Sequence, residues 1–126
     1  MKEELEKLSM GFIKYNNFEL VDILDNKVII KAPLTENAMN PYDMAHGGFI
    51  FTLGDTAMGV LCRTTGRNAI TVNANINYLK PGKGPYLTAE SEMLKQGNKI
   101  CFLKANIYDS EHNLIANMEG TYYFVN

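Results

Sequence analysis

The sequence has little of what marks exported, membrane-spanning or nucleic-acid-binding chains. Its 126 residues carry a formal net charge of −2, so it lacks the basic surplus of a nucleic-acid-binding surface. Its longest apolar run lies near the middle of the chain and is too short to cross a bilayer. The first ten residues, MKEELEKLSM, lack the apolar core of a signal peptide. We therefore expect a cytoplasmic protein that binds neither nucleic acid nor membrane.

Cysteine is also scarce. Cys62 and Cys101 lie in apolar surroundings without the spacing of metal ligands, so we expect free thiols and no metal or other cofactor. Internal repeats and linker-like segments are absent from the sequence. A hydrophobic fraction of 46% with 21% charged residues is typical of a folded globular chain. Residues 1–126 are therefore predicted to form one domain around a single core.

The stretch 40–62, NPYDMAHGGFIFTLGDTAMGVLC, is the feature around which the rest of the chain is arranged. Its apolar residues point almost all round a helical wheel, which predicts a buried helix. Because a carboxylate in apolar surroundings costs on the order of several kcal/mol, Asp55 is the first candidate for a functional residue. It shares one narrow stripe of the helix with other small and polar residues, namely Thr52, Thr56, Gly59 and Arg63.

Before this stretch, residues 1–15 have the spacing of a short amphipathic helix. Residues 18–24 and 27–34 predict two strands, and Asp25-Asn26 between them is a hairpin signal.

After the central helix, apolar and polar residues alternate strictly over 70–78, with four polar residues on one face: Thr71, Asn73, Asn75 and Asn77. Segments 86–95, 100–108 and 114–125 complete an antiparallel meander of four long strands. We expect an α+β fold in which an antiparallel sheet of about six strands wraps around one long central helix, with a short helix at the N-terminus.

Asn40 is followed after five residues by His46-Gly47-Gly48, then by Leu53-Gly54-Asp55, and then by the strand TVNANINYLKP at 71–81. This combination resembles the hotdog-fold acyl-CoA thioesterases, most closely the phenylacetate-degradation (PaaI-like) type. The resemblance covers nearly the whole chain and implies hydrolysis of acyl- or aryl-CoA thioesters to free acid and CoA. At one position, Asp43, the family often has Gly.

The resemblance also implies a role for each catalytic residue. Gly47, at the helix N-terminus, would donate its backbone N–H to the thioester carbonyl, where the helix dipole stabilises the developing oxyanion. Asp55 would be the general base that activates water, or the nucleophile that forms a mixed anhydride. Asn40 and His46 would orient the carbonyl or the water, and Thr71 would help to hold that water.

Substrate binding would involve three further residues. Gly48 would allow the acyl thioester to approach the backbone closely, because it has no Cβ. Lys80 and Lys83 are the most plausible cations to meet the phosphates of CoA.

The resemblance further implies a homodimer, or a homotetramer built as a dimer of dimers, with active sites at the dimer interface. Each site would then combine Asn40, His46 and Gly47 of one subunit with Asp55 and Thr71 of the other.

Plainer interpretations stay open at this point. A histidine beside glycines is commonly a helix cap, and Asn40 before a proline can be a turn residue. Two other functions are also compatible with a hotdog fold. One is an enoyl-thioester hydratase or dehydratase that pairs His46 with Asp55, and the other is a non-catalytic acyl-CoA-binding module.

Overall fold

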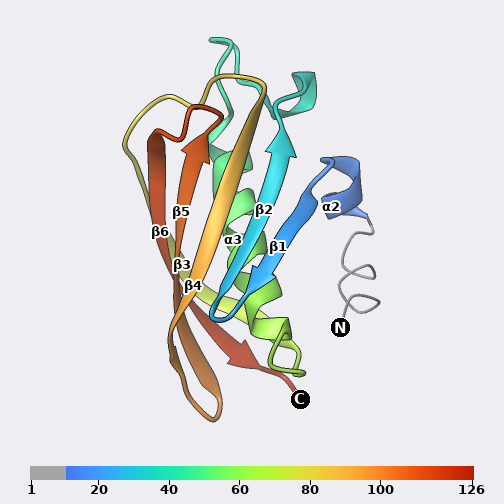
Figure 1. Ribbon diagram of the computed structural model, residues 1–126, viewed down its shortest axis with the longest axis vertical. Helices are drawn as coiled ribbons and strands as arrows, with labels where there is room; N and C mark the ends of the chain where they lie inside the picture. Colours follow the sequence, from blue (N-terminus) through green and yellow to red (C-terminus); the bar gives the residue numbers. More distant parts are fainter. Residues whose placement is uncertain (1–10) are drawn as a thin grey trace.

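The computed structural model describes residues 11–126, and the predicted sequence of strands and central helix is confirmed there (Figure 1). The predicted N-terminal helix appears as the short α2, whereas residues 1–10 lie outside the described part of the chain. In chain order the described elements are α2 (Phe12–Tyr15), β1 (Glu19–Leu24), β2 (Lys27–Pro33), the 3-10 turn η1 (Glu36–Ala38), α3 (Gly47–Arg63), β3 (Ala69–Tyr78), β4 (Tyr86–Gln96), β5 (Ile100–Asp109) and β6 (Leu114–Phe124).

Over residues 11–126, six antiparallel strands form one sheet in the order β1-β2-β4-β5-β6-β3. Tight turns join β1 to β2 and β5 to β6. Each contains a residue with left-handed backbone, Asn26 and His112, both with φ of 64°. Asparagine tolerates this conformation better than most residues, which explains why Asp25-Asn26 is an effective hairpin signal.

The position of β3 contradicts the predicted meander. β3 does not pair with β4, which follows it in the chain, but with β6 at the edge of the sheet. The connecting residues 79–85 contain two prolines and two glycines and do not form a tight hairpin. Seven extended residues reach about 23 Å, and three strand spacings amount to only about 14 Å. The link can therefore pass β5 and β6.

β3 also departs from the predicted strict alternation. Its register with β6 shifts between Thr71 and Asn73, so that Val72 is an extra residue in a bulge. Because one extra residue reverses the facing of the side chains, Thr71 faces α3, away from Asn73. The predicted placement of Thr71 on the polar face is therefore wrong, and the bulge is the reason.

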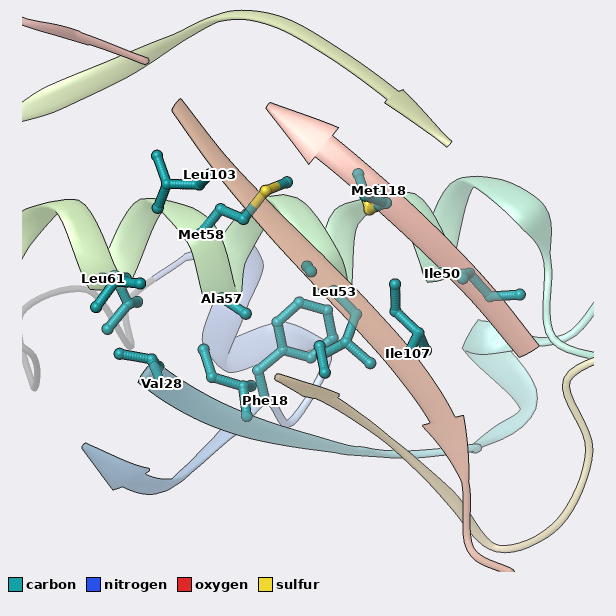
Figure 2. Close-up of a cluster of buried hydrophobic side chains, with 14 of the residues drawn as sticks. Phe18, Val28, Ile50, Leu53, Ala57, Met58, Leu61, Leu103, Ile107 and Met118 are labelled. Atoms are coloured by element: carbon teal, nitrogen blue, oxygen red, sulfur yellow. The ribbon is translucent and has the colours of Figure 1, made fainter. Parts of the chain in front are cut away.

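Helix α3 packs against one face of the sheet and supplies much of the core (Figure 2). Gly54 allows the helix to approach the sheet closely, because a Cβ there would lie 2.1 Å from the sulfur of Met118. The helix is not buried on every side as predicted. Asp55 and its neighbours on the polar stripe are only half-buried, so the carboxylate lies at an opening and not inside the apolar core.

Candidate active site

Helix α3 is capped by His46, and the cap leaves one donor open. His46 Nδ1 accepts a hydrogen bond from Gly48 N–H at 2.9 Å, and the His46 carbonyl accepts from the N–H groups of Phe49 and Ile50. Among the described residues, the Gly47 N–H is the one of the first four helical N–H groups without an acceptor. It lies at the positive end of the helix dipole. Gly47 can therefore donate to a developing oxyanion.

The two glycines of the His-Gly-Gly motif make room for protein side chains. A Cβ at residue 47 would lie 3.2 Å from the hydroxyl oxygen of Tyr78, and one at residue 48 would lie 3.1 Å from Nδ1 of His46. The Tyr78 hydroxyl also donates to the Gly47 carbonyl at 2.7 Å. The sequence predicts that these glycines allow close approach of the acyl group. In the structure, a Cβ at either position would first meet a protein side chain. Tyr78 holds the Gly47 peptide from the side of the sheet.

The loop before the helix is shaped by Asn40. Its Oδ1 accepts from the backbone N–H groups of Tyr42 and Met44, at 2.9 and 3.1 Å. In the part of the chain that the structure describes, its Nδ2 makes no hydrogen bond, which leaves an amide donor beside the helix N-terminus. Asp43 lies inside this loop with φ of 63°, a left-handed conformation that favours glycine. Asp43 therefore has a backbone conformation that suits the glycine often found at this position in the family.

These groups surround a cavity of about 300 Å³. We call Asn40, Gly47, Tyr78 and Lys80 the donor half-site, because they present a backbone N–H, an amide, a hydroxyl and an ammonium group. The remaining lining is mainly apolar: Met44, Ala45, Ile50, Leu79, Pro81 and Gly82.

The carboxylate of Asp55 is held by two hydroxyl groups from the sheet. Its Oδ1 accepts from Thr71 Oγ1 at 2.8 Å and from the Tyr122 hydroxyl at 2.5 Å. Thr71 and Tyr122 are directly opposite each other on β3 and β6, which brings both hydroxyls to the same oxygen. We call Asp55, Thr71 and Tyr122 the carboxylate half-site.

Burial and the neighbouring Asp55 charge raise the pKa of Tyr122 far above its usual value, so this hydroxyl stays protonated. Similarly, burial raises the pKa of the Cys62 thiol to about 12. Cys62 and Cys101 are buried free thiols, as predicted.

A second cavity, of about 360 Å³, opens beside Asp55. Arg63 brings a cation to its lining. The other lining residues are Ile13, Thr56, Gly59, Val60, Ala69, Ile70, Thr71 and Tyr122.

The two half-sites lie apart within one chain. Gly47 and Asp55 are separated by eight residues of the same helix, which at 1.5 Å per residue is about 12 Å along the axis. Their cavities share no lining residue. A general base must come within hydrogen-bond reach of the group it serves, directly or through one water. Asp55 therefore cannot serve a carbonyl bound at Gly47 of its own chain.

The predicted residues accordingly fall into two groups. Asn40, Gly47 and Lys80 line the first cavity, whereas Asp55 and Thr71 line the second. The other three predicted residues line neither cavity. His46 and Gly48 make the helix cap, and Lys83 is exposed on the loop beyond Lys80.

Two tyrosines were not predicted as site residues. Both lie in strands, where aromatic side chains are common, and Tyr122 is buried in the core whereas Tyr78 is exposed at the end of β3. For Tyr122 a signal was available in Gly120, since a glycine inside a strand often marks close packing. A Cβ at Gly120 would lie 2.8 Å from the Tyr122 ring.

In residues 11–126 no cluster of His, Cys, Asp and Glu side chains has an arrangement that could bind a metal ion. Within the same residues, none of the helices is sufficiently long and apolar to span a membrane.

Residues 42–116 match the family described as the Thioesterase superfamily. The chain belongs to this superfamily. It is 30% identical over 117 residues to human acyl-coenzyme A thioesterase 13, with 85% of this chain and 84% of the human protein covered. The activity of this chain is thioester hydrolysis. This agrees with the function expected from the sequence and not with the two alternatives, a hydratase and a pure binding module.

Two solved structures extend the comparison. The chain superposes on the Escherichia coli PaaI protein of the phenylacetic acid degradation operon with a TM-score of 0.91 at 21% identity, covering 98% of this chain and 91% of PaaI. This likeness confirms the predicted hotdog fold. A hypothetical thioesterase protein from Streptococcus pneumoniae TIGR4, crystallised with coenzyme A, superposes with a TM-score of 0.83 at 29% identity, covering 89% and 91% of the two chains. The predicted resemblance to PaaI-like thioesterases is confirmed.

Proposed function

We propose that this thioesterase hydrolyses acyl- or aryl-CoA thioesters, with each active site assembled from the donor half-site of one subunit and the carboxylate half-site of another. The observation that carries this proposal is the separation of about 12 Å between Gly47 and Asp55 along α3. One chain offers the groups that stabilise an oxyanion and, in a different cavity, the group that activates a nucleophile. The CoA found in the S. pneumoniae structure and the name of the human relative support CoA as the leaving group.

At the donor half-site the thioester carbonyl oxygen accepts from Gly47 N–H. As the carbonyl carbon becomes tetrahedral, negative charge develops on this oxygen beside the helix N-terminus, where the open N–H and the helix dipole stabilise it. Asn40 Nδ2 is a second donor on the same cavity wall, and it orients the carbonyl or the incoming water. Lys80, on the rim of the cavity, meets a phosphate group of CoA, with Lys83 as a further cation along the same loop.

At the carboxylate half-site, Asp55 supplies the base that deprotonates water or is itself the nucleophile. Thr71 holds the carboxylate and hence the water or acyl group beside it. His46 acts through the helix cap, which fixes the direction of the first-turn N–H groups. A cytoplasmic location and a single domain over 1–126 stay predictions from the sequence.

Thiol release tests the reaction. The protein is assayed at micromolar concentration with a panel of straight-chain acyl-CoAs and aryl-CoAs, while absorbance at the enoyl-thioester band is followed in parallel. We expect release of free CoA thiol without any change in the enoyl band. Hydration without thiol release, or binding without turnover, would overturn the proposal.

Complementation tests the shared site. Asn40→Asp retains the Oδ1 acceptor that shapes the loop but loses the amide donor, and Asp55→Ala removes the carboxylate. Each homodimer carries a lesion in both sites and should be nearly inactive. After the two variants are mixed, unfolded and refolded, half of the dimers are mixed and each has one intact site, so roughly a quarter of wild-type activity should return. If mass spectrometry confirms mixed dimers but activity stays at the level of the separate variants, the shared site is refuted.

A further inference from the structure

Tyr122 is the side chain most closely tied to the Asp55 carboxylate. Its hydroxyl lies 2.5 Å from Asp55 Oδ1 and 3.1 Å from the backbone carbonyl oxygen of the same residue. A phenol has one proton to donate. The shorter distance identifies the carboxylate as its main acceptor, since hydrogen bonds to charged oxygens are the shorter and stronger ones.

The Tyr122 ring is enclosed between β6 and α3. It is 1% exposed, and Gly120 on the same face of β6 leaves it room that a Cβ would fill at 2.8 Å. On the helix side it lies over Gly59, where a Cβ would be 3.9 Å away. Two glycines thus provide space for an aromatic ring between β6 and α3. The hydroxyl of this ring donates to Oδ1 of Asp55.

Both donors to the carboxylate use the same oxygen. Thr71 Oγ1 and the Tyr122 hydroxyl converge on Oδ1, and among the described residues no hydrogen bond is made to Oδ2. Since Asp55 lines the cavity of about 360 Å³, its second oxygen is the one that remains for a ligand there.

From this geometry we infer that Tyr122 is a positioning residue of the hydrolytic site: it fixes Oδ1 so that Oδ2 is the oxygen that takes the proton from water or attacks the thioester. The inference rests on the proposed function for the role of Asp55, but the hydrogen bond itself is independent of it. The Tyr122 hydroxyl is bonded to Oδ1 and not to the reacting oxygen Oδ2, so it acts on the reaction through Asp55.

The kinetic test compares Tyr122→Phe with Tyr123→Phe. The first variant keeps the buried ring and removes only the hydroxyl, whereas Tyr123 is the next residue on the opposite, outer face of β6 and is 40% exposed. We expect Tyr122→Phe to lower kcat about ten- to a hundredfold with KM changed less than about twofold, because substrate binding is retained while the reacting oxygen loses its fixed position. Tyr123→Phe should match the wild type in both constants. A Tyr122→Phe protein with wild-type kcat overturns the inference.

A second measurement does not depend on activity. A hydroxyl proton in a short hydrogen bond to a carboxylate exchanges slowly and gives a downfield proton resonance. We expect this resonance in the wild type and in Tyr123→Phe, and we expect it to be lost in both Tyr122→Phe and Asp55→Asn. If the wild type lacks the resonance, the hydrogen bond and the inference fail. If the resonance behaves as expected but the wild type releases no thiol from any CoA ester, the proposed function fails instead.

Thermal melting of the same variants separates positioning from folding. If Tyr122→Phe unfolds, Thr71→Val removes the other donor to Oδ1 while the Tyr122 ring stays in place. Thr71→Val should also lower kcat more than it raises KM. A fall in activity that only follows the melting temperature in both variants would overturn the positioning role.

Discussion

The donor half-site and the carboxylate half-site lie on one helix but are built from different parts of the chain. At the helix N-terminus the donor for the oxyanion is a backbone group, the open Gly47 N–H, which lies between the turn capped by His46 and the loop shaped by Asn40. At Asp55 the important groups are side chains that converge from β3 and β6. The direction of the oxyanion donor therefore depends mainly on local conformation, whereas the position of the carboxylate depends on tertiary structure.

This difference predicts how strongly substitutions in each half-site lower the activity. Every substitution except proline keeps the backbone N–H, so other changes at Gly47 should displace this donor by tenths of an ångström and lower activity moderately. A side-chain carboxylate can be removed outright, and the loss should be large. The variants below test this comparison, from the largest expected effect to the smallest.

Asp55→Asn should cause the largest loss of activity. The amide keeps the shape and can still accept from Thr71, but it can neither take a proton nor attack a carbonyl. We expect turnover to fall by on the order of 10²–10⁴. Because Asp55 is half-buried and at an opening, the melting temperature should change by only a few degrees.

The matched control is Asp22→Asn, which makes the same chemical change on the exposed strand β1. It should leave both turnover and melting temperature unchanged. If Asp55→Asn unfolds but its folded fraction keeps full specific activity, Asp55 has a structural role only. The proposed catalytic role of the carboxylate half-site would then be wrong.

Gly47→Ala should have an intermediate effect. The N–H remains, but the new Cβ would lie 3.2 Å from the Tyr78 hydroxyl oxygen and 3.3 Å from a ring carbon, which forces a small displacement. Small misplacements near a reacting centre are costly, and we expect a loss of about tenfold in kcat.

A double-mutant cycle with Tyr78→Ala identifies the cause of that loss. If the clash with Tyr78 displaces the peptide, Gly47→Ala should cost less than about twofold once the ring is absent. An unchanged tenfold loss in the Tyr78→Ala background would mean that the methyl group obstructs the substrate directly, as the sequence alone suggests.

The two halves also differ in how well the sequence predicts them. Two groups of the donor half-site, Asn40 and Gly47, lie in one continuous motif from Asn40 to Gly48, which can be read directly together with the helix that follows. Tyr78 and Lys80 lie farther along the chain. The carboxylate half-site needs three distant segments. Asp55 stands out because it is a carboxylate among apolar residues, but Tyr122 does not, because an aromatic residue on the inner face of a strand is normal core.

The fold shows the same division between local and distant information. Alternation and turn residues give the bounds of most strands, because both are local properties. The pairing of β3 with β6 is a non-local choice that no local pattern encodes. The bulge at Val72 adds a single residue to an otherwise regular strand, and only the partner strand makes it visible. Thr71 reaches Asp55 because of that one residue.

Substitutions at Asp43 should have the smallest effect, and they test whether the donor half-site depends on backbone conformation. Asp43 has φ of 63°, and its side chain makes no hydrogen bond in the described part of the chain. Glycine adopts this conformation without steric cost, whereas alanine loses about 1–2 kcal/mol there. Against this, glycine adds freedom to the unfolded chain, which offsets about 0.4–1 kcal/mol. We therefore expect Asp43→Gly to raise the free energy of unfolding by at most about 1 kcal/mol, and Asp43→Ala to lower it by a similar amount. Both variants should retain kcat within about twofold, because neither removes a group of the half-site. Chemical denaturation measures the order of stability, and an Asp43→Ala protein as stable as Asp43→Gly would show that the left-handed turn is not what constrains this loop.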